Sequence, residues 1–421
     1  MGQQSQDMHD MAEAAERRFA LPARRRPMSA PVTVAFLARE HTFWYGFASI
    51  VEECRRRPRL RPVVILKDGE VDGPLVQEHP VEALRAQGVQ VVGEYAWKVL
   101  EQRPGVLFLQ KPYILVQDDY VPDVLVAHGI RPALIPYCTE SLGGDNFLHH
   151  YFRTTPYFWR VFASGGLSAG LYTRLKRLPP QSVPITGNPE YDMAGTPELL
   201  RKYQEIRSMA RGRRVVLWTP HYAMTPPFQW STWDTLGLDM ARLFAWHKKD
   251  VFVVLRPHQL LRHLCVAWAS GQKVDKYHAA VFDVVRQADN FCLDVRGTCL
   301  EAVLACDALV SDVSSMLAKA MRFGKSVLAT LRPGSDGMGP AQAVADAWMH
   351  QTADIRGVQR FLLRLLRGED PLLPVPDAVL DDFCGVADGK AAVRIADHLE
   401  AHFFPTASTP STGCRPNAQT T

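Results

Sequence analysis

The sequence predicts an α/β protein whose two doubly wound halves face a central cleft. Short runs of Val, Ile and Leu alternate with segments of helical periodicity between residues 32 and 330, which is typical of parallel βαβ units. These runs lack polar alternation, as strands covered on both faces require. Because 421 residues exceed what one core usually supports, we expect two domains.

In the first half, apolar runs alternate with two helical patterns. The helical patterns cover residues 43–56 and 81–88, and the second ends at Gly88. The predicted strands are 32–38, 61–66, 89–93, 104–110, 124–129 and 158–164, and residues 183–189 close the series.

A charged helical segment at residues 197–214 bridges to a second series. Its predicted strands are 215–222, 250–259, 291–295, 307–312 and 325–330, and its predicted helices are 238–249, 277–290, 299–306 and 314–324. We therefore predict a flexible leader at 1–30, a first Rossmann-like domain at 31–193, a helical linker at 194–213, a second domain at 214–404 and a Ser-, Thr- and Pro-rich disordered tail at 405–421.

Composition and charge exclude several classes of protein. Hydrophobic residues make up 47% and charged residues 22%, as in globular proteins, and a net charge of +4 is too small to argue for nucleic-acid binding. The eight cysteines form no CxxC pair, so we expect reduced thiols and no metal site or cofactor. No segment resembles a membrane span or a secretory signal. We expect a cytoplasmic protein. Basic clusters are usually solvated faces, but the arginine-rich segment 54–62 and the arginines of the leader are also candidates for docking on anionic lipid at the inner face of the plasma membrane.

Polar residues directly follow three apolar runs of the second half. They are Thr219, His221, Arg256, His258, Ser311, Asp312, Ser314 and Ser315. Ligands of doubly wound folds bind outside the carboxyl ends of the strands. A guanidinium forks onto phosphate oxygens, and the helix start near Ser314 offers hydroxyls and free N–H groups as both a cap and an anion site. These residues predict a site for a phosphate-bearing ligand.

In the first half, His128 ends the run 124–129 and is followed by Gly129, which allows close backbone approach. We expect His128 to face the second half across the cleft as a proton acceptor. The segment around Glu140 and Asp145 is interpreted as a mobile loop whose carboxylates are most simply solvated, although a loop just after the His128 run could also line the path of the acceptor. No glycine-rich phosphate loop of standard spacing is present.

The combination of motifs resembles the CDP-glycerol glycerophosphotransferase family, which makes teichoic acids and related capsule polymers. The resemblance rests on the Arg-Pro-His element at 256–258, the strand and Ser-Ser helix start at 306–329, and the segment 185–192 with Gly187, Asn188 and Pro189 at the domain junction. The Ala-His-Gly element at 127–129 is similar to the one that carries the family's presumed catalytic base. Glu190 and Ser326 stand where the family has a basic residue and a proline.

This resemblance implies a GT-B fold that holds a CDP-activated polyol in the second domain without an obligatory metal. His128 would activate a hydroxyl of a lipid-linked or polysaccharide acceptor, and His258 and Arg256 would stabilise the leaving nucleotide. The alternatives are a glycosyltransferase with a nucleotide-sugar donor, a sugar-nucleotide epimerase, and a non-catalytic scaffold of a surface-polysaccharide complex.

Overall fold

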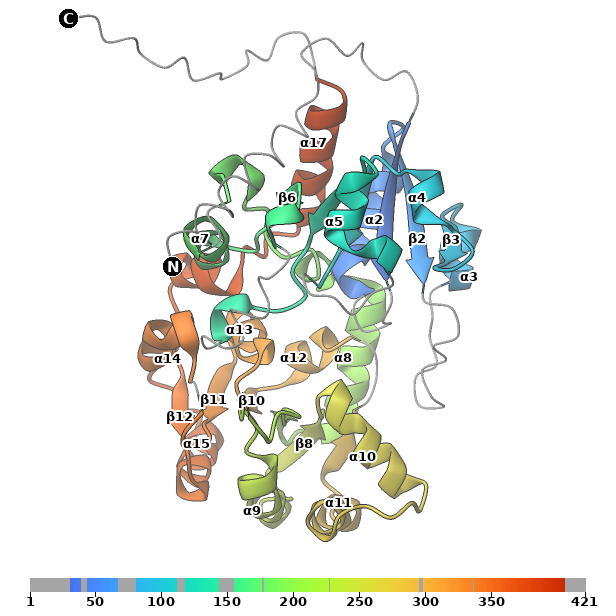
Figure 1. Cartoon of the computed structure of the whole chain (residues 1–421). Coiled ribbons are helices and arrows are strands. Elements are labelled where there is room, and N and C mark those ends of the chain that lie inside the picture. Colours follow the sequence, from blue (N-terminus) through green and yellow to red (C-terminus); the bar gives the residue numbers. More distant parts are fainter. Residues whose placement is uncertain are drawn as a thin grey trace, which may run out of the picture.

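The computed structural model describes residues 31–38, 44–66, 81–111, 118–143, 155–175, 178–226, 228–294, 298–335 and 337–405. It contains two six-stranded sheets, one above the other, with helices around each (Figure 1). The predicted leader, most of the predicted tail and Asp145 lie outside the described residues.

The first sheet has the strand order β3-β2-β1-β4-β5-β6, and its strands pair in parallel. The strands are β1 (Val32–Ala38), β2 (Leu60–Leu66), β3 (Gln90–Gly93), β4 (Val106–Leu109), β5 (Arg131–Leu134) and β6 (Arg160–Val161). Along β1, Val34 and Phe36 enter one apolar cluster while Ala35 and Leu37 enter another on the opposite face. This two-sided burial explains the unbroken apolar runs of the sequence.

The helices of the first half connect these strands. They are α2 (Tyr45–Arg56), α3 (Val81–Ala86), α4 (Val99–Gln102), α5 (Pro122–Ala127) and α7 (Gly166–Leu175). The helix α8 (Pro197–Ala210) then leads into the second half, where its residues Ile206 and Ala210 join the second core.

The second sheet repeats the arrangement with the parallel order β12-β11-β10-β7-β8-β9. The strands are β7 (Arg214–Thr219), β8 (Val251–Leu255), β9 (Phe291–Leu293), β10 (Ala308–Ser311), β11 (Ser326–Thr330) and β12 (His350–Thr352). The helices are α9 (Trp233–Trp246), α10 (Gln259–Ala269), α11 (Lys276–Gln287), α12 (Leu300–Ala305), α13 (Ser315–Arg322), α14 (Gln342–Trp348), α15 (Ile355–Arg367) and α16 (Asp377–Val379).

Each sheet reverses its strand order once, between β1 and β4 in the first sheet and between β7 and β10 in the second. At such a switch point the loops leave in opposite directions and open a crevice at the carboxyl ends of the strands. The predicted GT-B-like class, with two Rossmann-like domains around a cleft, is confirmed.

The last helix, α17 (Ala391–Phe403), belongs by sequence to the predicted second domain, 214–404, but returns to the first sheet. Figure 1 shows it in red beside the blue and teal elements of the first half. Ile395, Leu399 and Phe403 lie in the same apolar cluster as β1 and α2. Arg57, directly after α2, forms ion pairs with Asp397 and Glu400 of α17 and so connects α17 to α2.

Three predicted strands of the first half differ in the structure. The strand predicted at 124–129 is wrong, because residues 122–127 form α5, with a proline in its first turn. The run predicted at 158–164 pairs at β6 and through one isolated parallel bridge from Ala163 to Ile185, and this bridge is the only strand pairing of the described run 183–189. A short apolar run fits a buried helix turn as well as a strand. Among the described helices, none is both long and apolar enough to cross a membrane.

Candidate functional site

A cavity of about 270 Å³ lies between the carboxyl ends of the two sheets. From the second half it is lined by six of the predicted residues, namely Thr219, His221, Arg256, His258, Ser314 and Ser315. From the first half it is lined by Gly46, Gln110 and residues of the segment 135–143, which follows β5. The strand-end rule therefore located the second-half wall of the cavity.

Arg256 follows β8 and is the permanent positive charge of this wall. Its Nη1 donates to Asp294 Oδ2 over 2.7 Å, and both side chains are largely buried. Burial by itself disfavours the charged form, but the Asp294 carboxylate offsets it and raises the pKa of Arg256 above its usual value. The guanidinium is thus held in place, charged, at the edge of the cavity.

Two imidazoles lie beside each other on the same wall, with His221 and His258 ring centroids 4.8 Å apart. His221 Nδ1 accepts a hydrogen bond from the Ala223 N–H, and His258 Nδ1 accepts one from the Leu260 N–H at the start of α10. A ring nitrogen that accepts carries no proton, so each neutral ring bears its proton on Nε2.

Both imidazoles are neutral at physiological pH. Burial, reinforced by the neighbouring His258, holds the pKa of His221 well below its ordinary value. Burial and the nearby Lys111 ammonium lower the pKa of His258 to about 4. Two neutral N–H donors beside a guanidinium suit the oxygens of a phosphate.

The start of α13 faces the cavity with two serines that have different partners. Ser314 caps the helix, because its Oγ accepts from the Met316 N–H and lies 3.0 Å from Ser311 Oγ. Ser315 Oγ instead accepts from the Thr139 N–H of the first half over 2.8 Å. Ser314 is therefore a cap at the cavity wall, whereas Ser315 joins the two halves.

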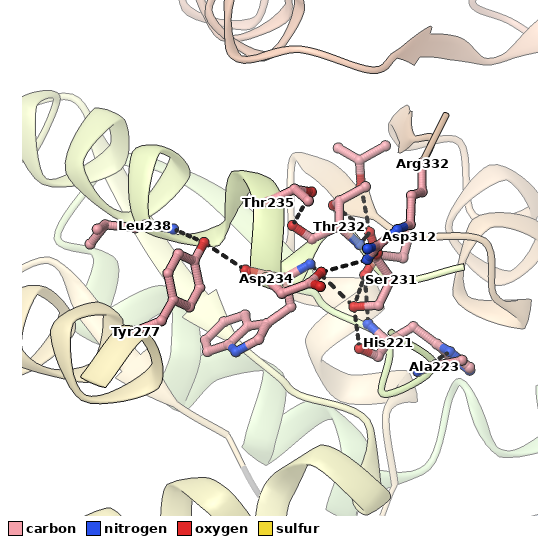
Figure 2. Close-up of polar contacts among 12 residues, drawn as sticks. His221, Ala223, Ser231, Thr232, Asp234, Thr235, Leu238, Tyr277, Asp312 and Arg332 are labelled. Atoms are coloured by element: carbon pink, nitrogen blue, oxygen red, sulfur yellow. Dashed lines mark hydrogen bonds and ion pairs between the residues drawn. The ribbon is translucent and has the colours of Figure 1, made fainter. Parts of the chain in front are cut away.

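Asp312 and Ser311 lie beneath the cavity and do not line it. The buried Asp312 carboxylate accepts hydrogen bonds from the His221 N–H, the Thr232 N–H and hydroxyl, and the hydroxyls of Ser231 and Thr330 (Figure 2). Burial raises its pKa. Asp312 thus holds the backbone of His221 beside Ser231 and Thr232, and with it the His221 imidazole.

A buried cation, Lys319, reaches the cavity one turn further along α13. Its Nζ donates to Glu190 Oε2 and lies 3.3 Å from Cys299 Sγ. Glu190 belongs to the junction segment, so this ion pair connects the junction to the helix of the second half. Burial acts to lower the pKa of Lys319, but the groups around it, Cys299 and Glu190 first, raise it above its usual value.

The predicted junction residues lie where both halves meet. Gly187 has a φ of +88°, and a Cβ there would come within 2.7 Å of the Val386 carbonyl oxygen, so only glycine suits this position. Asn188 lines the cavity, and its Oδ1 accepts from the Glu190 N–H. The Pro189 carbonyl accepts from Ser49 Oγ of α2.

His128 does not reach the cavity. It follows the last turn of α5, is exposed to solvent, and its Nδ1 lies 2.9 Å from the Val124 carbonyl oxygen. It precedes β5, so it lies at the amino ends of the strands, opposite the cleft. No imidazole from the first half is among the described residues that line the cavity.

Glu140 is also placed differently from the prediction of a solvated carboxylate, because it is fully buried. It accepts hydrogen bonds from Tyr172 OH over 2.7 Å and from Ser168 Oγ, both on α7. Burial raises its pKa to about 7. Glu140 therefore anchors the segment 139–143, which lines the cavity.

Gln110, Lys319 and residues 135–139 line the cavity without having been predicted, whereas Leu142 and Gly143 belong to the loop that was considered as a lining of the acceptor path. Gln110 follows the apolar run of β4, so the strand-end rule would have found it had it been applied to the first half. Residues 135–139 were missed because the run 124–129 was taken for the strand, whereas β5 begins only at Arg131. Within the described ranges, no group of three or more His, Cys, Asp or Glu side chains could hold a metal ion.

No family model matches the sequence, and no curated protein is similar to it. Solved structures are similar in fold. The wall teichoic acid polymerase TagF superposes with a TM-score of 0.58 at 14% identity, covering 95% of this chain and 94% of that chain.

Two structures that contain a bound nucleotide are also similar in fold. Staphylococcus aureus MnaA in a co-structure with UDP has a TM-score of 0.58 at 13% identity and covers 90% of this chain and 99% of that one. A UDP-GlcNAc 2-epimerase from Neisseria meningitidis bound to UDP-GlcNAc has a TM-score of 0.55 at 13% identity, with 87% and 99% covered. At these identities the similarity establishes the GT-B-like fold.

Proposed function

We propose that this protein is a transferase that takes a nucleotide-activated donor in the cleft and passes a polyol phosphate to a hydroxyl acceptor. The donor's pyrophosphate would lie against Arg256, His221, His258 and the start of α13. The acceptor would enter along the first-half wall, formed by Gln110 and the segment 135–143.

The observation that carries this proposal is the protonation of the two cavity histidines. Their Nδ1 atoms are occupied as acceptors by backbone N–H groups, so their Nε2 atoms are donors. Together with Arg256 and Ser314 they form a wall rich in hydrogen-bond donors, which matches a ligand rich in acceptors. The Trp230 ring, 5.4 Å from the His221 ring, adds an apolar surface suited to a nucleobase.

In the proposed step, an acceptor hydroxyl oxygen bonds to the phosphorus nearer the polyol. The bond between that phosphorus and the bridging oxygen breaks, and its electron pair leaves with the nucleoside monophosphate. The hydroxyl proton is released to solvent. His258, His221 and Arg256 stabilise the charge on the leaving phosphate, which is where most catalytic help is needed in phosphoryl transfer.

A nucleotide-sugar substrate is the second candidate. Within this candidate, an epimerisation has no acceptor hydroxyl to deprotonate, and the described cavity residues of the first half include no imidazole for that step. The second candidate is also consistent with the UDP and UDP-GlcNAc named for two proteins of the same fold. On that alternative, attack occurs at a sugar carbon or the sugar is epimerised without an acceptor.

We propose a lipid-linked or polysaccharide acceptor. Docking of the segment 54–62 on anionic lipid would depend mainly on the exposed Arg59 and Arg61, because its other three arginines are paired within the protein. Arg55 and Arg56 form ion pairs with Glu52 on the same helix. Arg57 pairs with Glu53 and with acidic residues of α17. Charges already neutralised within the protein contribute little to binding an anionic surface.

The test is a donor panel with two readouts, binding by calorimetric titration and release of nucleotide on turnover. Binding of CDP-glycerol with release of CMP in the presence of an acceptor supports the transferase. Release of UDP or CDP from a nucleotide sugar, or its conversion to an epimer, supports the second candidate. Binding without any turnover indicates a scaffold, and a wild-type protein that binds no nucleotide diphosphate contradicts both enzyme proposals.

A further inference from the structure

We propose that Gln110 is a hydroxyl-recognition residue, and that the ligand of the cavity carries free hydroxyl groups on the side opposite its phosphates. The inference rests on the proposed function for the identity of the nucleotide but has its own test. The carbonyl oxygen of the Gln110 side chain is a buried hydrogen-bond acceptor for which the described residues provide no donor.

Gln110 directly follows β4, at the switch point of the first sheet. Its side chain lines the cavity and is only 6% exposed. Within the described part of the chain, no group donates a hydrogen bond to its Oε1. Buried side-chain oxygens are nearly always paired, so an unpaired one at a cavity wall indicates a ligand group.

The side chain is also held in this place by its surroundings. Gly46, near the start of α2, lies directly behind it, and a Cβ at that position would be 2.2 Å from Gln110 Nε2. The absence of a side chain at Gly46 therefore makes the space that the amide occupies. The amide is enclosed between α2 and the cavity.

The opposite wall has a matching feature. Thr219 Oγ1, at the end of β7 and the switch point of the second sheet, is buried and likewise has no partner among the described residues. Each sheet thus presents one unsatisfied oxygen at the point where a doubly wound fold binds its ligand.

The chemistry of the two walls specifies the ligand class. His221, His258 and Arg256 donate, and phosphate oxygens satisfy them. An amide oxygen accepts, and a phosphate diester has no proton to give it. A hydroxyl group on carbon has such a proton. A polyol phosphate or a sugar phosphate can therefore accept hydrogen bonds from the second-half wall and donate one to Gln110 at the same time.

The experiment compares ligands that differ only in hydroxyl groups. Glycerol 3-phosphate and propyl phosphate carry the same charge, as do CDP-glycerol and the propyl ester of CDP. We define the hydroxyl preference as the ratio of the two dissociation constants within a pair, measured by calorimetric titration. The wild type should prefer glycerol 3-phosphate by about 3- to 10-fold, the range for one added hydrogen bond.

Two variants remove this preference by different routes. Gln110→Met keeps the length of the side chain but cannot accept, and Gly46→Ala displaces the amide without removing it. Both should bring the preference close to one and leave binding of propyl phosphate within about twofold. Gly46→Ala should also keep the melting temperature, because the group it displaces is the end of a flexible side chain and alanine suits a helix.

The exposed Gln272→Met is the matched control and should keep the wild-type preference. The inference is overturned if the wild type shows no hydroxyl preference, including the case in which it binds neither phosphate, or if the preference survives in both Gln110→Met and Gly46→Ala. The small phosphates decide this even when no nucleotide binds. If the small phosphates show the hydroxyl preference but neither CDP compound binds, the proposed donor is contradicted and the hydroxyl site is still supported.

Discussion

At the scale of single residues, the cavity is specified by which atom of each polar side chain is already used. His221 and His258 are turned into donors by backbone N–H groups that occupy their Nδ1 atoms. Ser315 is engaged by Thr139, whereas Ser314 stays at the cavity wall as a cap. The two neighbouring serines therefore have different roles, one as a helix cap at the cavity wall and the other as a contact between the two halves.

The first prediction concerns Arg256 and the two serines. Arg256→Lys should weaken nucleotide-diphosphate binding by about 1–3 kcal/mol, because an ammonium cannot reproduce a forked contact that also holds Asp294. Ser314→Ala should weaken binding as well, while Ser315→Ala should mainly lower the melting temperature. Calorimetric titration and thermal melting distinguish these effects, with the exposed Arg242→Lys as the control. Equal affinities in Arg256→Lys and the wild type would remove Arg256 from the site.

The second prediction concerns Asp312, which lies under the cavity. Asp312→Asn keeps the size of the side chain but replaces one acceptor oxygen by a donor, so hydrogen bonds from His221, Ser231 or Thr232 are lost. We expect the free energy of unfolding to fall by about 1–3 kcal/mol and nucleotide binding to weaken through the displaced His221. Chemical denaturation and titration measure the two effects. Unchanged stability would show that the carboxylate does not hold His221 beside Ser231 and Thr232.

At the scale of elements, α17 is the helix whose position the local sequence does not reveal. It packs on the first sheet beside α2, and its histidines lie against the first domain. The His402 ring lies 4.6 Å from the Trp159 ring, and Arg160 Nε donates to His398 Nε2. Protonation of His398 at that nitrogen abolishes its ability to accept.

The third prediction is an acid sensitivity of this helix. Burial, with the nearby Arg131 and Arg160 guanidinium groups, lowers the pKa of His402 to about 3, and burial with Arg160 lowers that of His398 to about 4. Both lie below the unfolded value of 6.5. The unfolded chain therefore binds more protons as the pH falls from 6.5 towards 4, and stability should decrease over that window by about 2–4 kcal/mol.

Melting temperatures measured between pH 7 and pH 4 test this acid sensitivity. The double variant His398→Gln/His402→Gln should lose less stability than the wild type over the same window, and the exposed His263→Gln should behave as the wild type. The buried Glu140 and Glu301, whose pKa values burial raises to about 7, act in the opposite direction. They are present in all these proteins, so they cancel in the comparison. Parallel pH curves for the wild type and the double variant would contradict the assignment.

At the scale of the whole molecule, the two halves are joined by polar contacts around the cavity. Ser315 bonds to Thr139, and Lys319 bonds to Glu190 of the junction. The Lys319 and Glu190 side chains are only 10% and 13% exposed, so their ion pair is shielded from solvent. A buried pair that loses one charge leaves the other uncompensated.

The fourth prediction follows from that pair. Glu190→Gln should lower the free energy of unfolding by about 1–3 kcal/mol, because the Lys319 ammonium stays buried without its counter-charge. The double variant Glu190→Gln/Lys319→Met removes both charges and should recover part of the loss. Denaturant midpoints of the wild type, Glu190→Gln, Lys319→Met and the double variant form a double-mutant cycle. Strictly additive losses would show that the two charges do not interact.

The alternation of strands and helices, the presence of two sheets and the second-half wall of the cavity could be predicted from the local sequence. Burial of a strand on both faces appears directly as an unbroken apolar run, and polar residues after such runs must lie at the carboxyl edge of a parallel sheet. Thr219, Arg256 and His258 were predictable for this reason, since their positions depend only on neighbours in the chain.

Only the tertiary structure decided the features that depend on residues far apart in the chain. The run before His128 fitted a strand or a helix, and packing made it α5, which placed His128 away from the cleft. Glu140 is buried because α7 covers it, and α17 returns to the first sheet because Arg57 and the apolar face of α2 receive it. Gln110 became a candidate ligand group only when the fold enclosed its amide beside Gly46, because the lack of a partner is a property of the surroundings and not of the residue.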